Sequence, residues 1–293
     1  MVIELKKNNT IAKIQTKGAE IISFKGEDGK EKIWQADPLV WDRHSPVLFP
    51  VCCAVKNNII IVDGKEYPMT KHGFVRDYEF EISNKGEDFA DLVMKPDEFY
   101  KSKFPFDYEL HVYFKLLDNA FSCRFIVENK SDRMMPFCIG GHPGFICPLD
   151  EESSFEDMEV VFECAENGVV SLLDSKGEII KNVIFNELEG KDRFTLDRSY
   201  FEERDTLIFP ELKSRLVKLI SKKTGKGIKF SFSDMPVLAI WTKSGVKADY
   251  VCLEPWQGLP AGVDETSVLS DKPFAVKLEA GSKFECGYEA EII

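Results

Sequence analysis

Residues 108–127, YELHVYFKLLDNAFSCRFIV, contain two runs in which apolar and polar side chains alternate. The apolar positions are Tyr108, Leu110, Val112, Phe114 and Leu116 in the first run, and Phe121, Cys123, Phe125 and Val127 in the second. Successive side chains of a β-strand point to opposite faces, so this alternation gives each strand one buried face and one face in water. Such strands are typical of antiparallel sheets. The stretch therefore predicts two antiparallel strands that are joined by a turn at Asp118-Asn119.

Similar strand signals recur along the chain, at residues 158–164, 228–232 and 284–290. Dipeptides that favour β-hairpins, such as Asp28-Gly29 and Asp63-Gly64, separate other apolar runs. No long segment has the 3.6-residue period of a helix, and the candidates for short helical turns are residues 38–43 and 198–203. No linker, repeat or low-complexity run divides the 293 residues. We therefore predict an all-β fold with little helix, in which residues 1–293 form one domain, a large antiparallel β-sandwich.

The charge of the chain excludes some classes of partner. Fifty acidic and 38 basic residues give a formal net charge of −12, whereas binding to nucleic acid needs a basic face. No basic amphipathic stretch suits a membrane surface, and no apolar run approaches the roughly 18 residues of a spanning helix. The first residues, MVIELKKNNTIAKIQ, lack the apolar core of a signal peptide, so we expect a cytoplasmic protein.

The eight cysteines are scattered, and no two of them form a C-x-x-C pair. In a protein without an export signal, such cysteines are most simply free thiols, and several of them fall at apolar positions of predicted strands. The pattern does not predict a zinc site.

Three segments interrupt the alternation, and each combines an ionisable residue with glycine or proline and an aromatic residue. They are KHGFVRD (71–77), GGHPGF (140–145) and CLEPWQGLPAG (252–262). Functional side chains often lie where strands end and loops begin. His142 and Glu254 are the first candidates, because an imidazole titrates near neutrality and burial can raise the pKa of a carboxyl group towards it. Together they could move protons in both directions without a metal ion or cofactor.

On spacing alone, a purely structural role explains these residues about as well as a functional role does. His142 could simply hydrogen-bond a neighbouring carbonyl group, and Glu254 could cap a turn. An aromatic wall beside polar groups suits a sugar, whose C–H face is apolar and whose hydroxyls need hydrogen-bond partners. Trp256 is the candidate for such a wall, whereas Phe74 and Phe145 are more simply explained as core residues.

Six motifs follow one another along nearly the whole chain. They are SPVLFP (45–50), VDGKEYPM (62–69), KHGFVRD (71–77), GGHPGF (140–145), DTLIF (205–209) and CLEPWQGLP (252–260). Each motif alone is weak, but their order and spacing resemble the aldose 1-epimerase (galactose mutarotase-like) family, closest to its LacX-like bacterial branch. The resemblance implies a large β-sandwich, the galactose mutarotase-like supersandwich, with the sugar in an open cleft on one sheet.

The resemblance also implies an activity and a set of site residues. Members of the family interconvert the α and β anomers of free aldoses without a cofactor, by ring opening and reclosure. By motif match, Glu254 is the base that takes the proton from the anomeric O1 hydroxyl, and His142 is the acid that protonates the ring oxygen. His72 corresponds to a second histidine that binds the sugar, and Asp205 to an aspartate that binds a sugar hydroxyl.

One departure from the family concerns an arginine. Relatives carry a Gly-Arg pair after LFP, and this arginine reaches a sugar hydroxyl, whereas this chain has Cys53 and Ala54. Either Arg76 or, as the less favoured candidate, Arg43 supplies the cation from another direction, or the protein binds a different sugar, or binds it weakly.

The leading hypothesis is therefore an aldose mutarotase that acts on a neutral hexose, as a monomer or homodimer. A variant that acts on a hexose 6-phosphate would need a basic pocket, for which Lys71 and Arg76 lie close to the candidate site, although the acidic chain makes this less attractive. A carbohydrate-binding protein without catalysis is the alternative from another class. A glycoside hydrolase ranks last, because it needs two carboxylates at the scissile bond.

Overall fold

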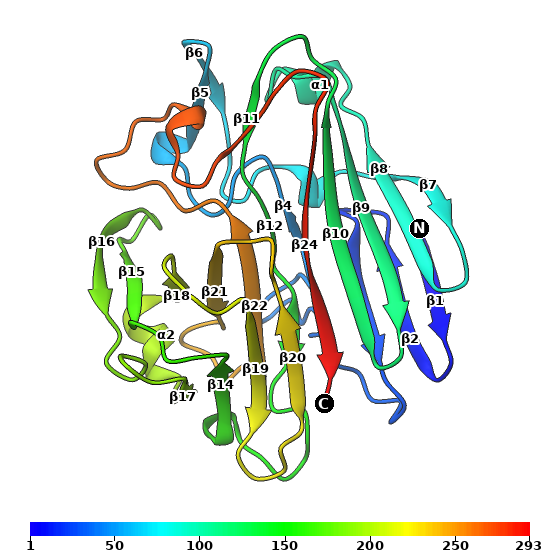
Figure 1. Cartoon of the computed structure of the whole chain (residues 1–293), viewed down its shortest axis with the longest axis vertical. Helices are drawn as coiled ribbons and strands as arrows, with labels where there is room; N and C mark the ends of the chain where they lie inside the picture. Colours follow the sequence, from blue (N-terminus) through cyan, green and yellow to red (C-terminus); the bar gives the residue numbers. More distant parts are fainter.

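The computed structural model describes residues 1–293 and confirms the all-β class, with 24 strands, two short α-helices and four 3-10 turns (Figure 1). The stretch 108–127 forms the hairpin of β9 (Tyr108–Leu117) and β10 (Ala120–Asn129), in which Val112 lies opposite Phe125. Asn119 adopts the positive φ of 52° that this tight turn requires. The alternation thus predicts both the strands and their register.

Two large antiparallel sheets contain most of the strands. The nine-stranded sheet has the order β17 (Arg193–Thr195), β14 (Met158–Phe162), β19 (Leu216–Ser221), β20 (Gly227–Ser231), β24 (Lys283–Ile292), β10, β9, β8 (Phe89–Met94) and β7 (Glu81–Lys85). The eight-stranded sheet has the order β16 (Ile179–Ile184), β15 (Val169–Leu173), β18 (Thr206–Phe209), β21 (Val237–Trp241), β22 (Tyr250–Gln257), β12 (Ile139–Gly141) and β4 (Val47–Leu48), and β13 (Gly144–Ile146) also pairs with β22.

Smaller elements complete the fold. The small sheets are β1 (Val2–Lys7) with β2 (Thr10–Gln15) and β3 (Glu20–Lys25), β5 (Ile59–Val62) with β6 (Lys65–Pro68), and β11 (Met135–Phe137) with β23 (Val276–Leu278). The helical elements are α1 (Glu98–Lys101), α2 (Ser199–Arg204), η1 (Lys56–Asn58), η2 (Val75–Asp77), η3 (Phe155–Asp157) and η4 (Leu269–Asp271). Of the two expected helical turns, one is α2, whereas residues 38–40 form a non-helical turn.

The core lies between the two large sheets. Phe145 of β13 packs on Phe230 of β20 with ring centroids 5.9 Å apart, and Phe209 of β18 packs similarly on β14. The three-stranded sheet covers another part of the nine-stranded sheet, where Phe24 packs edge-on against Phe121 at 4.9 Å. These contacts belong to a continuous cluster of 66 buried residues, and each buried Phe contributes about 1.5–3 kcal/mol relative to an exposed one. The predicted sandwich is therefore confirmed, with a third small sheet added to it.

All eight cysteines are free, and seven of them are buried. Cys164 is the exception: the alternation placed it on a core face, but β14 ends at Phe162 and Cys164 is exposed. Phe74 and Phe145 are core residues, as expected. No helix in the structure has the length and apolar character that crossing a membrane would require.

Candidate active site

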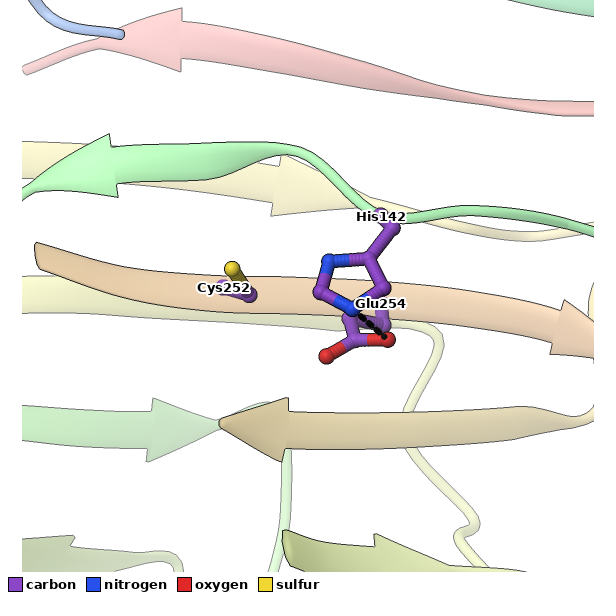
Figure 2. Close-up of side chains that lie close together, drawn as sticks. All are labelled: His142, Cys252 and Glu254. Carbon is purple, nitrogen blue, oxygen red and sulfur yellow. Dashed lines mark ion pairs between the residues drawn. The ribbon is translucent and has the colours of Figure 1, made fainter. Parts of the chain in front are cut away.

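His142 and Glu254 lie next to each other in the eight-stranded sheet, although only Glu254 lies within a strand. Glu254 lies in the middle of β22, opposite Ala239 of β21. His142 lies in the short break between β12 and β13, both of which pair with the other edge of β22. In Figure 2 the two side chains point towards each other, and Nε2 of His142 lies 3.1 Å from Oε2 of Glu254. The sheet thus brings together two residues that are 112 positions apart in the sequence.

The glycines beside His142 allow close packing on both sides of the sheet. A Cβ atom on Gly140 would lie 2.6 Å from Cδ1 of Trp256, and one on Gly141 would lie 2.6 Å from Cε1 of Tyr288 in the nine-stranded sheet. Such distances are too short for any side chain, so the backbone around His142 lies closer to its neighbours than other residues permit. The GGHPGF motif therefore has a packing reason as well as a chemical one.

A cavity of about 290 Å³ opens beside this pair. It is lined by all six residues that the sequence nominated, namely His142, Glu254, His72, Asp205, Arg76 and Trp256. The volume lies just below the usual range for small-molecule sites, about 300–1,000 Å³, and therefore suits a single sugar unit better than an oligosaccharide.

Burial determines where the protons of the pair reside. The exposed fraction of the side chain is 10% for His142 and 2% for Glu254. Burial raises the pKa of the Glu254 carboxyl well above its usual value, although the nearby charge of Lys71 opposes this. Burial also lowers the pKa of His142 to about 3, and the positive charges of Lys71 and Arg76 contribute in the same direction. Both shifts favour the uncharged forms of the pair, a protonated carboxyl group and a neutral imidazole.

His72 is held in one tautomer by the backbone of Cys53. The N–H of Cys53 donates to Nδ1 of His72 at 3.0 Å, and the N–H of His72 donates to the carbonyl of Cys53 at 2.9 Å. Burial lowers the pKa of His72 well below its usual value, so the ring is neutral and carries its proton on Nε2. The next residue must be glycine, because a Cβ atom on Gly73 would lie 2.0 Å from the carbonyl oxygen of Phe49. His72 thus presents a hydrogen-bond donor at the cavity.

Three of the residues that line the cavity have a strained backbone. Cys53, His72 and Asp205 all line it, and their φ angles are 58°, 67° and 60°, in the region that favours glycine. Such conformations cost about 1–3 kcal/mol each and tend to persist at functional sites. Asp205 follows α2 directly, and its Oδ2 accepts a hydrogen bond from the Thr206 hydroxyl at 3.1 Å.

Two tryptophans that the sequence did not single out line the cavity with more exposed surface than Trp256. Trp256 is 1% exposed and belongs to a small cluster of buried apolar residues. Trp41 and Trp241 are half-buried, and their ring centroids lie 5.0 and 5.6 Å from that of His142. The sequence offered one indication of a functional role for Trp41, which is its position in WDRHSPVLFP just before the first motif. Trp241 ends an apolar strand, and no sequence feature marked it as a site residue.

Four cations line the cavity in place of the family arginine, and they are Arg43, Lys71, Arg76 and Lys243. Ala54 itself lies in the small apolar cluster and is not a lining residue. The structure thus brings both candidate arginines to the site and adds two lysines, of which Lys243 had no signal in the sequence.

The thiol of Cys252 lies near the pair, and its sulfur and the donor atoms of His142 and Glu254 are within 4.8 Å of one another (Figure 2). This group could hold a metal ion only after losing two protons, because burial raises the pKa of both the thiol and the carboxyl well above their usual values. The arrangement therefore suits proton transfer between His142 and Glu254 better than metal binding.

Comparisons with known proteins address the family and the fold of the chain. The family model described as aldose 1-epimerase matches residues 1–266. The plasmid-encoded protein LacX of Lactococcus lactis subsp. lactis is 34% identical over 285 residues, which cover 95% of each chain. A galactose mutarotase related enzyme from Lactobacillus acidophilus has a TM-score of 0.92 at 31% identity, covering 100% of this chain and 97% of the other. A galactose mutarotase-like protein from Lactobacillus casei has a TM-score of 0.93 at 27% identity, with full coverage of both chains.

The matches extend over the strands that carry His142 and Glu254, and they support an isomerase function of the mutarotase type. On its sequence and its fold, this chain belongs to the aldose 1-epimerase family.

Proposed function

We propose that the protein is a cofactor-independent aldose 1-epimerase that interconverts the α and β anomers of a hexose, with Glu254 as base and His142 as acid. The observation that carries this proposal is the 3.1 Å contact between Nε2 of His142 and Oε2 of Glu254 at the wall of a cavity of sugar size. A buried pair that holds a single proton offers one group to accept a proton and one to donate it.

The reaction needs a carboxylate and an imidazolium, which the free protein reaches by moving one proton across the 3.1 Å contact. The positive charge of Lys71 favours the carboxylate form of Glu254. Glu254 then takes the proton of the O1 hydroxyl, the C1–O1 double bond forms and the C1–O5 bond breaks. The electron pair of that bond goes to O5, which takes the proton of His142.

The open-chain aldehyde then rotates about C1–C2 and closes on its other face. The O5 hydroxyl attacks C1 and returns its proton to His142, while the carbonyl oxygen takes a proton from Glu254. Both side chains thereby regain their starting states, and no electrons enter or leave the sugar. Holding the open chain between the two groups converts a slow solvent reaction into a first-order step at one site.

The other lining residues have binding roles in this proposal. Nε2–H of His72 and the carboxylate of Asp205 bind sugar hydroxyls, and Arg76 contributes a cationic donor. Trp41 and Trp241 supply apolar surface for the C–H face of the ring, with Trp256 beneath them. We also propose that residues 1–293 act as one domain, which the continuous 66-residue core supports.

Polarimetry on freshly dissolved α-D-glucose and α-D-galactose tests the activity. We expect optical rotation to reach its equilibrium value faster than in buffer, at a rate proportional to protein concentration. If no aldose or aldose phosphate equilibrates faster than in buffer, the enzymatic proposal fails, and a sugar-binding protein without catalysis takes its place.

A further inference from the structure

One wall of the candidate cavity belongs to a connection without helix or strand, residues 26–46, which joins β3 to β4. Trp41 and Arg43 of this connection line the cavity, and the Trp41 ring lies 5.0 Å from that of His142. Such a segment has few backbone hydrogen bonds of its own, so its position depends on contacts with the rest of the chain. The contacts that hold residues 34–46 therefore determine where the Trp41 ring lies.

Glu20, the first residue of β3, holds the backbone of this segment at the end nearest β4. Its Oε1 accepts hydrogen bonds from the N–H groups of His44 at 2.7 Å and Ser45 at 2.6 Å. Its Oε2 accepts one from Nε2 of Gln15 at 2.8 Å, and the residue is only 3% exposed. A carboxyl group in the interior needs such donors, because an unpaired oxygen there is costly. Glu20 is the only side chain outside residues 34–46 that accepts a hydrogen bond from their backbone.

The same hydrogen bonds extend to the loop that carries His142. The carbonyl oxygen of His44 accepts the N–H of Gly144 at 2.9 Å, and the carbonyl oxygen of Gly144 accepts the N–H of Trp34 at 2.9 Å. Nε1 of Trp34 donates to the carbonyl oxygen of Trp41 at 2.9 Å. A Cβ atom on Gly144 would lie 2.9 Å from Cζ3 of Trp41, so the segment lies directly against the GGHPGF motif. A shift of the His44 backbone would therefore move the Trp41 ring relative to His142.

We propose that Glu20 is a positioning residue of the sugar site, which fixes the backbone of His44 and Ser45 and thereby places the Trp41 ring beside His142. The proposal rests on the mutarotase function, in which Trp41 supplies apolar surface for the sugar. Glu20 itself does not line the cavity, so it acts through the segment that it holds. A displacement of about 1 Å in a group that positions the substrate can cost up to about 10²-fold in rate.

The chain contains a matched glutamate that holds a different loop. Glu166 is 2% exposed, and its two oxygens accept the N–H groups of Ser214 at 2.8 Å and Lys213 at 3.1 Å. Neither Glu166 nor the loop that it holds lines the cavity. Glu20 and Glu166 thus make the same kind of bond, and only the segment held by Glu20 carries residues of the site. A comparison of the two separates positioning of the site from a general contribution to stability.

The kinetic test uses Glu20→Gln. Whichever way the new amide is turned, its NH2 group faces either Nε2 of Gln15 or the two backbone N–H groups, so one set of bonds is lost. With whichever of D-glucose and D-galactose the wild type equilibrates faster, we expect KM to rise about 10- to 100-fold and kcat to change less than about threefold. In a Trp41→Ala background the same change should alter KM less than about threefold, because Glu20 acts through Trp41. Glu166→Gln should leave KM within about threefold of wild type.

Hydrogen–deuterium exchange tests the same contact without the reaction. Glu20→Gln should speed amide exchange in residues 34–46 about tenfold or more and leave residues 213–216 unchanged, whereas Glu166→Gln should do the reverse. If Glu20→Gln does not fold, Glu20→Asp takes its place with the same expectations, because its shorter side chain withdraws the carboxylate from both N–H groups.

The outcomes separate this proposal from the mutarotase function. An unchanged KM in the Glu20 variant, or an equal rise in KM with and without Trp41, refutes positioning and leaves the mutarotase in place. If the wild type accelerates no aldose, the mutarotase function fails, and amide exchange alone decides whether Glu20 holds this wall. Faster exchange in residues 34–46 of the Glu20 variant then sustains that contact, and unchanged exchange refutes it.

Discussion

Replacement of Glu254 by glutamine removes the proposed base with little change in shape or charge. The Glu254 side chain is 2% exposed, and burial raises its pKa well above the usual value, which favours the uncharged carboxyl form. A glutamine amide is also uncharged, and its N–H can donate to Nε2 of His142 across the same 3.1 Å contact. We therefore expect the free energy of unfolding of Glu254→Gln to stay within about 1 kcal/mol of wild type.

The catalytic effect should be much larger than the effect on stability. General acid–base catalysis typically contributes about 10²- to 10⁴-fold, which corresponds to about 2.7–5.5 kcal/mol of the barrier. Because glutamine cannot accept the O1 proton, we expect kcat to fall by this factor with KM changed less than about threefold. Polarimetry at saturating sugar gives kcat, and urea unfolding gives the stability.

A matched control is Glu178→Gln, which changes a buried glutamate outside the cavity and should leave kcat unchanged. If Glu254→Gln retains kcat within about threefold of wild type while it folds normally, Glu254 is not the base. A loss of kcat that follows a loss of stability of several kcal/mol would equally fail to support the proposed role.

Three further predictions concern the same groups. His142→Asn should also reduce kcat about 10²-fold or more. Because the two groups act as a unit, the kcat of the double variant with Glu254→Gln should lie within about threefold of that of the less active single variant. Additive losses of kcat would show that the two residues have independent roles. For the pH profile, the pKa of His142 is lowered to about 3, so kcat/KM should show no acid limb near pH 6.5. The raised pKa of Glu254 should move the alkaline limb upwards from the usual carboxyl range, since the pair loses its last proton there. An acid limb near pH 6.5 would mean that His142 titrates as a solvated histidine. His72→Asn keeps an acceptor for the Cys53 N–H but loses the Nε2–H donor. We therefore expect KM to rise about tenfold with a smaller change in kcat. A fall in kcat without a rise in KM would contradict a binding role for His72.

Local sequence patterns predicted the elements of the fold but not their order in the sheets. The 108–127 hairpin follows from alternation and one tight turn, both of which are local features. By contrast, β10 also pairs with β24, where Phe125 lies opposite Cys286. No local signal indicates a pairing between residues so far apart in the sequence, since it depends on the packing of the whole sandwich.

The residues of the candidate site also fall into two groups, those that a local motif marks in the sequence and those that only the fold brings together. His142, Glu254 and His72 could be nominated because each lies in a short motif with glycine or proline, where the backbone requirement leaves a mark in the sequence. Trp41 and Lys243 could not, because their place beside His142 depends on distant loops that meet at the cavity. The positive charge of the cavity was hidden for the same reason, since the total composition indicates the opposite sign.

Exchange NMR at anomeric equilibrium tests the central claim most directly. In D₂O, wild-type protein should give cross-peaks between the α and β H1 resonances of its substrate that buffer alone does not give, with no deuterium entering C1 or C2, because ring opening leaves both C–H bonds intact. Glu254→Gln and His142→Asn should abolish these cross-peaks. Wild-type protein without enhanced exchange, or variants that exchange as fast as wild type, would contradict mutarotation by the His142–Glu254 pair.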